Sequence, residues 1–114
     1  MSNPLSPDAL KGATPAGLAA LWTGAGVAPG DTLLLHSNTL RWTWSLKRAG
    51  CADPVALLLE SFLDAVGARG TLLLPLFNFD FTTGVPFDMR TTPSRMGALT
   101  EAGRLHPRAK RTRH

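Results

Sequence analysis

The sequence predicts an α/β protein with a mainly parallel sheet and flanking helices in αβα layers, a fold that we expect to be incomplete within this chain. Along the 114 residues, helical patterns alternate with short apolar runs in the order helix, strand, helix, strand, helix. Such alternation is typical of βαβ units and a parallel sheet. The two apolar runs contain consecutive leucines at 33–35 and 72–74, a pattern typical of strands buried on both faces. Two such strands do not make a complete sheet.

The first half of the chain is predicted to contain one helix and one strand. Residues 1–13 are expected to form a loose leader. Thr14 followed by Pro15 is typical of a helix start, because threonine caps the backbone N–H groups and proline suits the first turn. The predicted helix spans 16–22, with Leu18, Leu21 and Trp22 on one face. A strand is expected over 32–36, followed by a loop with one helical turn over 37–52.

The second half begins with the same cap-plus-proline signal at Asp53 and Pro54. The predicted helix over 55–66 buries a stripe made of Val55, Leu58, Leu59, Phe62, Leu63 and Val66. A second strand is expected over 71–76 and a long loop over 77–92; loops of this length are often functional. A third helix is predicted from Pro93 to Leu105.

Composition excludes several classes of protein. A hydrophobic content of 44% with 18% charged residues fits a globular protein, and no run approaches the roughly 20 apolar residues of a membrane span. The N-terminal residues lack the pattern of a secretory signal, so we expect a cytoplasmic protein without a membrane partner. The single cysteine, Cys51, excludes a disulfide framework. Histidine spacing predicts no metal site.

The positive charge is concentrated at the C-terminus. Residues 1–103 carry seven Lys or Arg and eight Asp or Glu, whereas residues 104–114 carry five Lys or Arg and no acid. This basic tail leaves nucleic-acid binding open as a less favoured hypothesis, because no aromatic residues interleave the charges. A fragment of a surface loop or edge strand is favoured.

Polar residues follow the first predicted strand, where ligands of open α/β sheets bind. The segment from His36 to Arg41 offers hydroxyls, backbone N–H groups and a cation, which suit phosphate oxygens. An ordinary solvated loop is the alternative. A hydrolase pair of His36 and Ser37 is not expected, because adjacent strand residues point to opposite faces. Trp42 and Trp44 would share a face of an extended segment, where they either stack on a flat ligand or cover apolar surface. Asp80, after the second strand, could bind an amine or cap a strand.

Four blocks in order resemble the aminoglycoside 3-N-acetyltransferase family and cover nearly the whole chain. They are Gly26–Ser37, with a Gly-Val-x-Pro-Gly-Asp turn, a strand and His-Ser; Gly67–Pro75; Thr92–Glu101; and Arg111–His114, which resembles the start of an Arg-Ser-x-His-Pro block. Asn38 stands where family members often have a second serine. The loop after it is basic and rich in tryptophan instead of glycine.

The resemblance implies an enzyme that transfers acetyl directly from acetyl-CoA to an amine of an aminoglycoside or related amino sugar, without a covalent acyl-enzyme. It implies CoA contacts for two groups of residues: His36, Ser37, Asn38, Thr39, Leu40 and Arg41, and more weakly Ser94, Arg95, Met96 and Gly97. Asp80 is implied as a contact of the amino-sugar acceptor.

Family members are more than twice as long, and their catalytic histidine lies in a later segment. The resemblance therefore implies that residues 1–114 are the single N-terminal part of an acetyltransferase domain, which stops before the catalytic base. A non-catalytic module that binds CoA or a nucleotide is the alternative. The acceptor and a homodimeric state are left open.

Overall fold

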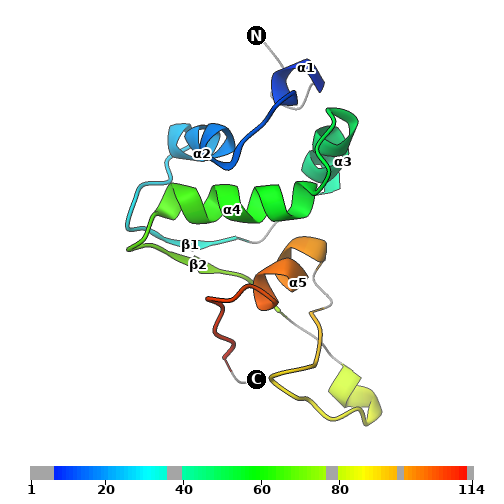
Figure 1. Cartoon of the computed structure of the whole chain (residues 1–114). Coiled ribbons are helices and arrows are strands. Elements are labelled where there is room, and N and C mark those ends of the chain that lie inside the picture. Colours follow the sequence, from blue (N-terminus) through cyan, green and yellow to red (C-terminus); the bar gives the residue numbers. More distant parts are fainter. Residues whose placement is uncertain (1–6, 36–39, 77–79, 95–96, 113–114) are drawn as a thin grey trace.

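The computed structural model describes residues 7–35, 40–76, 80–94 and 97–112 (Figure 1). The segments at 1–6, 36–39, 77–79, 95–96 and 113–114 lie outside this description. In chain order the elements are α1 (Pro7–Leu10), α2 (Pro15–Gly24), β1 (Thr32–Leu34), α3 (Leu40–Arg48), α4 (Pro54–Val66), β2 (Thr71–Leu73), the 3-10 helix η1 (Asp80–Thr83) and α5 (Ala98–Arg104).

Helix α4 lies at the centre of the described structure, between α2 and the two strands (Figure 1). Its start is fixed locally, because the side chain of Asp53 accepts a hydrogen bond from the backbone N–H of Ala56 at 3.1 Å and Pro54 occupies the first turn. Gly67, with φ of 73°, ends it. The predicted helix over 55–66 is confirmed. Its most deeply buried apolar side chains are Leu58, Leu59, Phe62, Ala65 and Val66.

Helix α2 packs along α4 through Trp22. Its predicted start is confirmed, since the Thr14 side chain accepts from the backbone N–H of Gly17 at 3.1 Å. The indole of Trp22 stacks on Phe62 with ring centroids 4.6 Å apart and donates through Nε1 to the buried hydroxyl of Ser61 at 2.9 Å. The predicted apolar face was wrong at Leu21, which is 42% exposed. The other two predicted residues, Leu18 and Trp22, pack in or against the hydrophobic core.

Strands β1 and β2 form a parallel pair with Leu33 opposite Leu72. The parallel arrangement predicted from the alternating pattern is confirmed, although both strands are shorter than expected. Leu33 and Leu72 pack against the core, whereas Leu34 and Leu73 are 66% and 47% exposed. The prediction of burial on both faces was therefore wrong for the described residues. Helices cover one face of the sheet, and a second helical layer remains a prediction.

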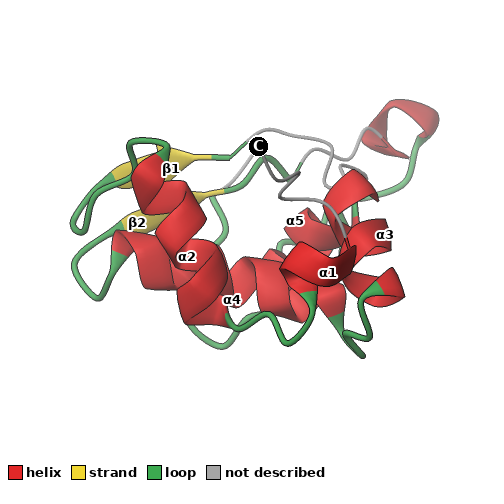
Figure 2. Ribbon diagram, turned by 90° about the horizontal axis from the view of Figure 1, so that it is seen from above, coloured by secondary structure: helices red, strands yellow, loops and turns green. Residues whose placement is uncertain are grey.

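Helices α1 and α3 gather at the end of α4 that lies away from the strands (Figure 2). Helix α5 packs on α4 near the carboxyl end of β2 (Figure 1). Helix α1 lies within the segment expected to be a loose leader, and its Leu10 is buried in the core. Helix α5 is shorter than the predicted helix over 93–105, and η1 lies within the predicted loop over 77–92.

Helix α3 corrects the loop predicted over 37–52. Because residues two apart point to nearly opposite sides of a helix, Trp42 and Trp44 do not share a face. Trp42 meets Trp22 edge-to-face at 5.1 Å between ring centroids, while Trp44 is 64% exposed. Leu46, one turn after Trp42, is fully buried. This i, i+4 apolar pair was the helical signal, and it was hidden among polar and basic residues.

A substitution at Gly70 tests how tightly the chain packs in the turn between α4 and β2. A methyl group there would lie 2.3 Å from the carbonyl oxygen of Val66, which is backbone and cannot rotate away. We expect Gly70→Ala to lower the free energy of unfolding by about 2–3 kcal/mol, measured by urea denaturation. Gly24→Ala is the matched control, because its methyl group would meet no atom within 4 Å. Equal stability of the two variants would contradict this packing.

Candidate functional site

The carboxyl ends of β1 and β2 lie side by side, because the backbone N–H of Leu35 donates to the carbonyl of Leu73 at 3.0 Å. This is the sheet edge where parallel α/β proteins bind ligands. His36, Ser37, Asn38 and Thr39 follow β1 directly and lie outside the described residues. The geometry of this candidate site therefore comes from the segments that flank them.

Helix α3 begins immediately after this junction. Leu40 is its first residue, and Arg41 in its first turn is exposed. The first turn contains no acidic residue, while Lys47 and Arg48 occupy the last turn. The N-terminus of a helix attracts anions through its unpaired N–H groups and its dipole. Arg41 therefore adds a positive charge to the first turn of α3, the element that follows β1 in the chain.

Ser94 and Gly97 precede α5 and take part in its N-terminal hydrogen bonds. The backbone N–H of Ser94 donates to Glu101 Oε2 at 2.7 Å, and its Oγ lies 2.8 Å from Thr100 Oγ1. Thr100 donates its single hydroxyl hydrogen to the carbonyl of Gly97 at 2.8 Å, so Ser94 is the donor in the hydroxyl pair. These contacts hold the approach to α5. Arg95 and Met96 lie outside the described residues.

Glu101 and Arg104 form an ion pair on α5 that reaches the preceding loop. Arg104 Nε donates to Glu101 Oε1 at 2.9 Å, its Nη2 contacts the same oxygen, and its Nη1 donates to the carbonyl of Arg90 at 3.2 Å. The Arg104 hydrogen bond holds the pKa of Glu101 below its ordinary value, and burial opposes it. The carboxylate raises the pKa of Arg104 in turn. The pair fixes α5 to the segment before it.

Arg111, which the sequence placed in the basic tail and at the start of the fourth family block, has contacts that sequence reasoning did not predict. Its guanidinium lies 4.8 Å from the ring centroid of Phe87 and donates to the carbonyls of Thr92 and Leu76, the latter at 3.4 Å. It therefore joins the tail, the loop after η1 and the end of β2. Local spacing carries no signal for these contacts; the resemblance of Arg111 to the start of a family block was the available hint.

Asp80, the predicted acceptor contact, is the first residue of η1. The loop after η1 is folded on itself around Asp88. The backbone N–H of Thr92 donates to the carbonyl of Asp88 at 2.9 Å, and that of Arg90 donates to Asp88 Oδ1 at 2.8 Å. Arg111 holds this turn near the end of β2. The described part of the predicted functional loop is thus held by hydrogen bonds around Asp88 and by Arg111.

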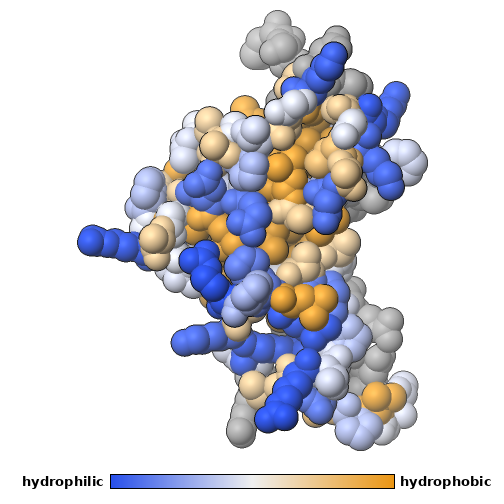
Figure 3. Space-filling view, viewed as in Figure 1, coloured by the Kyte–Doolittle hydropathy of each residue, from blue (hydrophilic) through white to orange (hydrophobic). Residues whose placement is uncertain are grey.

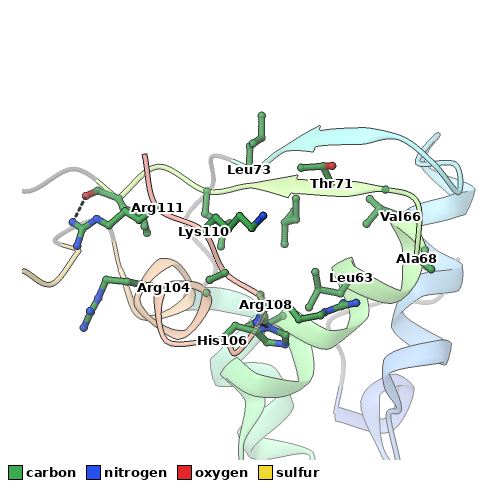
Figure 4. Close-up of a pocket in the computed structure, with 18 of the residues that line it drawn as sticks. Leu63, Val66, Ala68, Thr71, Leu73, Arg104, His106, Arg108, Lys110 and Arg111 are labelled. Atoms are coloured by element: carbon green, nitrogen blue, oxygen red, sulfur yellow. Dashed lines mark hydrogen bonds between the residues drawn. The ribbon is translucent and has the colours of Figure 1, made fainter. Parts of the chain in front are cut away.

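A groove of about 860 Å³ runs along the edge of β2 that faces away from β1 (Figure 4). Its walls come from α4, β2, the end of α5 and the following tail. It does not include Arg41, so it is separate from the junction between β1 and α3. Figure 3 shows apolar side chains exposed over the strands and α4, bordered by hydrophilic ones.

His106 stands at one wall of this groove with both ring nitrogens engaged. Its Nδ1 accepts from the backbone N–H of Arg108 at 3.2 Å, and its Nε2 lies 3.3 Å from Glu60 Oε1. The neutral tautomer with hydrogen on Nε2 satisfies both contacts. His36 and His114 lie outside the described residues, so His106 is the one histidine that the structure describes. Its ring links α4 to the end of α5.

Cys51, the single cysteine, is half-buried and packs against the core. Within the described ranges, no group of three or more His, Cys, Asp or Glu is gathered as metal ligands. None of the helices in the described part combines the length and apolarity needed to cross a membrane.

Comparison with known proteins gives one family. The sequence model described as aminoglycoside 3-N-acetyltransferase matches residues 34–114, from the end of β1 through the C-terminal tail. This range contains all the predicted CoA and acceptor contacts. No solved structure matches the chain.

The Glu101–Arg104 pair predicts a pH-dependent contribution to stability. Because the pKa of Glu101 is lowered by folding, the contribution is fully present above its ordinary value of 4.5 and is lost as pH falls through the lower folded value. We expect Glu101→Gln to reduce the free energy of unfolding by about 1 kcal/mol at pH 7, and the difference from the parent to shrink towards pH 3. Urea denaturation at both pH values measures this.

Asp64→Asn is the control for this prediction, because Asp64 is exposed on α4 and the substitution makes the same charge change. Its effect on stability is expected to stay within about 0.5 kcal/mol. A deficit of Glu101→Gln that is identical at pH 7 and pH 3 would show that the ion pair is not its cause.

Proposed function

The chain belongs to the aminoglycoside 3-N-acetyltransferase family, and we propose on this basis that it serves acetyl transfer from acetyl-CoA to an amino group of an aminoglycoside or a related amino sugar. The observation that carries the proposal is the family match over 34–114, which spans the carboxyl ends of both parallel strands. We propose that residues 1–114 form the N-terminal, CoA-binding part of the acetyltransferase domain.

In this proposal, the segment after β1 holds the pyrophosphate and pantetheine of CoA. Its members are His36, Ser37, Asn38, Thr39, Leu40 and Arg41. Support comes from the flanks: Leu35 sits at the open end of the parallel pair, and Arg41 adds a cation at the first turn of α3. Phosphate oxygens are well matched by helix N-terminal N–H groups together with arginine. The residues present therefore fit an anionic cofactor at this end of the sheet.

Two further contacts belong to the same proposal. The segment of Ser94, Arg95, Met96 and Gly97 is proposed to approach CoA, although the N–H and hydroxyl of Ser94 already bond Glu101 and Thr100. These bonds suggest that Ser94 acts by holding the segment in place. Asp80 is proposed to contact the ammonium of the acceptor, from η1 beyond β2.

Acetyl transfer needs a base, because an ammonium is not a nucleophile until it loses a proton. His106 does not suit this role as placed, since both its ring nitrogens are hydrogen-bonded. This observation favours a second candidate function, which is binding of CoA without acetyl transfer. We assign no catalytic residue within the described ranges.

Calorimetry with acetyl-CoA tests the proposed CoA site. We expect binding, and we expect Arg41→Gln to weaken it about five- to tenfold through loss of one charge-assisted contact with phosphate. Arg48→Gln is the matched control, because it removes an equal charge from the opposite end of the same helix. Absence of heat and of a thermal shift with acetyl-CoA would remove the CoA assignment.

A thiol-release assay with acetyl-CoA and a panel of aminoglycosides tests whether the catalytic base lies within these residues. Binding without release supports a CoA-binding part that lacks the base. Rapid release would place the base within these 114 residues and contradict that view.

A further inference from the structure

The outer side of helix α3 presents one tryptophan among cations. Over residues 41–48 the exposed side chains are Arg41, Trp44, Lys47 and Arg48, and the helix contains no acidic residue. Trp44 is 64% exposed. Within the described ranges, no ion pair joins these cations to another residue. The side of α3 that a ligand can reach is therefore positive and carries a single aromatic ring.

The opposite side of α3 is committed to the core. Leu46 is fully buried, and Trp42 meets Trp22 edge-to-face at 5.1 Å between ring centroids. These contacts fix how the helix is rotated about its axis, so Trp44 is directed to the outer side. Among the described residues, the ring contacts involve Trp22, Trp42 and Phe62 but not Trp44. The indole of Trp44 therefore has a face available for a ligand.

The spacing of Arg41 and Trp44 suits a nucleotide. The two residues are three apart on one helix, so their Cβ atoms lie about 5–6 Å from each other. A helical side chain covers the turn that precedes it, so the indole lies over the turn that carries Arg41. Nucleotide bases stack on aromatic rings, and guanidinium groups bind phosphate. In CoA only the ribose separates the adenine from the pyrophosphate, so base and phosphate are presented close together.

We propose that Trp44 is the platform on which the adenine of CoA stacks, while Arg41, one turn before it, contacts the pyrophosphate. This inference rests on the proposed function and adds to it the residue that recognises the nucleotide. A donor that ends at phosphopantetheine gains nothing from Trp44, so this residue selects CoA over shorter acyl carriers. A lipid surface is a poorer match, because the apolar side of α3 is buried in the core.

Calorimetry with two acetyl donors tests the stack. Acetyl-CoA carries the nucleotide, whereas acetyl phosphopantetheine has the same thioester arm and one phosphate but no adenine. We expect Trp44→Ala to weaken the binding of acetyl-CoA about tenfold and to leave the binding of acetyl phosphopantetheine unchanged. A loss of equal size for both donors, or no loss for either, overturns the assignment of Trp44.

The unsubstituted chain separates failure of this inference from failure of the proposed function. If it binds acetyl-CoA and Trp44→Ala binds equally well, only the assignment of Trp44 falls. If it binds neither donor, the CoA site falls and the assignment falls with it. Leu105→Ala is the control, because Leu105 is 66% exposed and lies after α5. A loss of acetyl-CoA affinity as large as that of Trp44→Ala would reduce the effect to exposed apolar area and overturn the stack.

Two conservative variants separate stacking from simple apolar contact. Trp44→Phe keeps an aromatic face and is expected to stay within about threefold of the parent affinity for acetyl-CoA, whereas Trp44→Leu is expected to lose about as much as Trp44→Ala. Full affinity of Trp44→Leu would overturn stacking. Tighter binding of a short oligodeoxyadenylate than of acetyl-CoA to the parent chain would assign the face to nucleic acid and overturn the proposal.

Tryptophan fluorescence gives a second readout of the same contact. Trp22 and Trp42 pack against the core, so we expect a stacked adenine to quench mainly the emission of Trp44. Acetyl-CoA is expected to quench the parent chain and to have little effect on Trp44→Phe, and acetyl phosphopantetheine is expected to quench neither. Quenching of equal size in the parent and in Trp44→Phe would place the adenine elsewhere and contradict the proposal.

Discussion

The packing of α4 against its neighbours is the constraint on which the described structure depends. Helix α2 reaches it through Trp22, whose indole stacks on Phe62 and donates to Ser61. Helices α3 and α5 and strand β2 contact the same helix. The hydroxyl of Ser61 also donates to the carbonyl of Leu58 at 2.6 Å, so a buried polar group is satisfied within the core. Removing the apolar stripe of α4 would leave the remaining helices and the sheet without a common surface.

Placing α4 on one face of a two-stranded sheet leaves its other surfaces open. The exposed leucines at 34 and 73 mark the uncovered face, and the groove along β2 marks the unpaired edge. The carboxyl ends of the two strands are a third, separate region. The proposed CoA site and the groove therefore occupy different parts of one small sheet.

The cations near the C-terminus have more than one physical role. Arg104 holds α5 to the carbonyl of Arg90 through its pair with Glu101. Arg111 joins the tail to Phe87 and to the end of β2. Two of the five basic residues in 104–114 are therefore held by contacts within the chain, although the sequence reads as one uniformly charged tail. Charge that is held internally positions loops, whereas Arg108 and Lys110 are exposed.

The sequence by itself determined the helix starts at Thr14–Pro15 and Asp53–Pro54, the buried stripe of α4, the parallel strands and the family to which the chain belongs. The helix starts and the stripe are set within a few residues, so adjacent residues reveal them. The parallel pairing and the family follow from the order of elements and blocks along the chain. Only the tertiary structure decided that α3 packs through Trp42, that one face of the sheet is exposed, and that Arg111 and His106 are linking residues. The physical reason is separation: Trp22 and Ser61 are 39 residues apart, Arg111 and Leu76 are 35 apart, and His106 and Glu60 are 46 apart. Contacts of that range depend on how the elements pack, and no spacing within a single element encodes them.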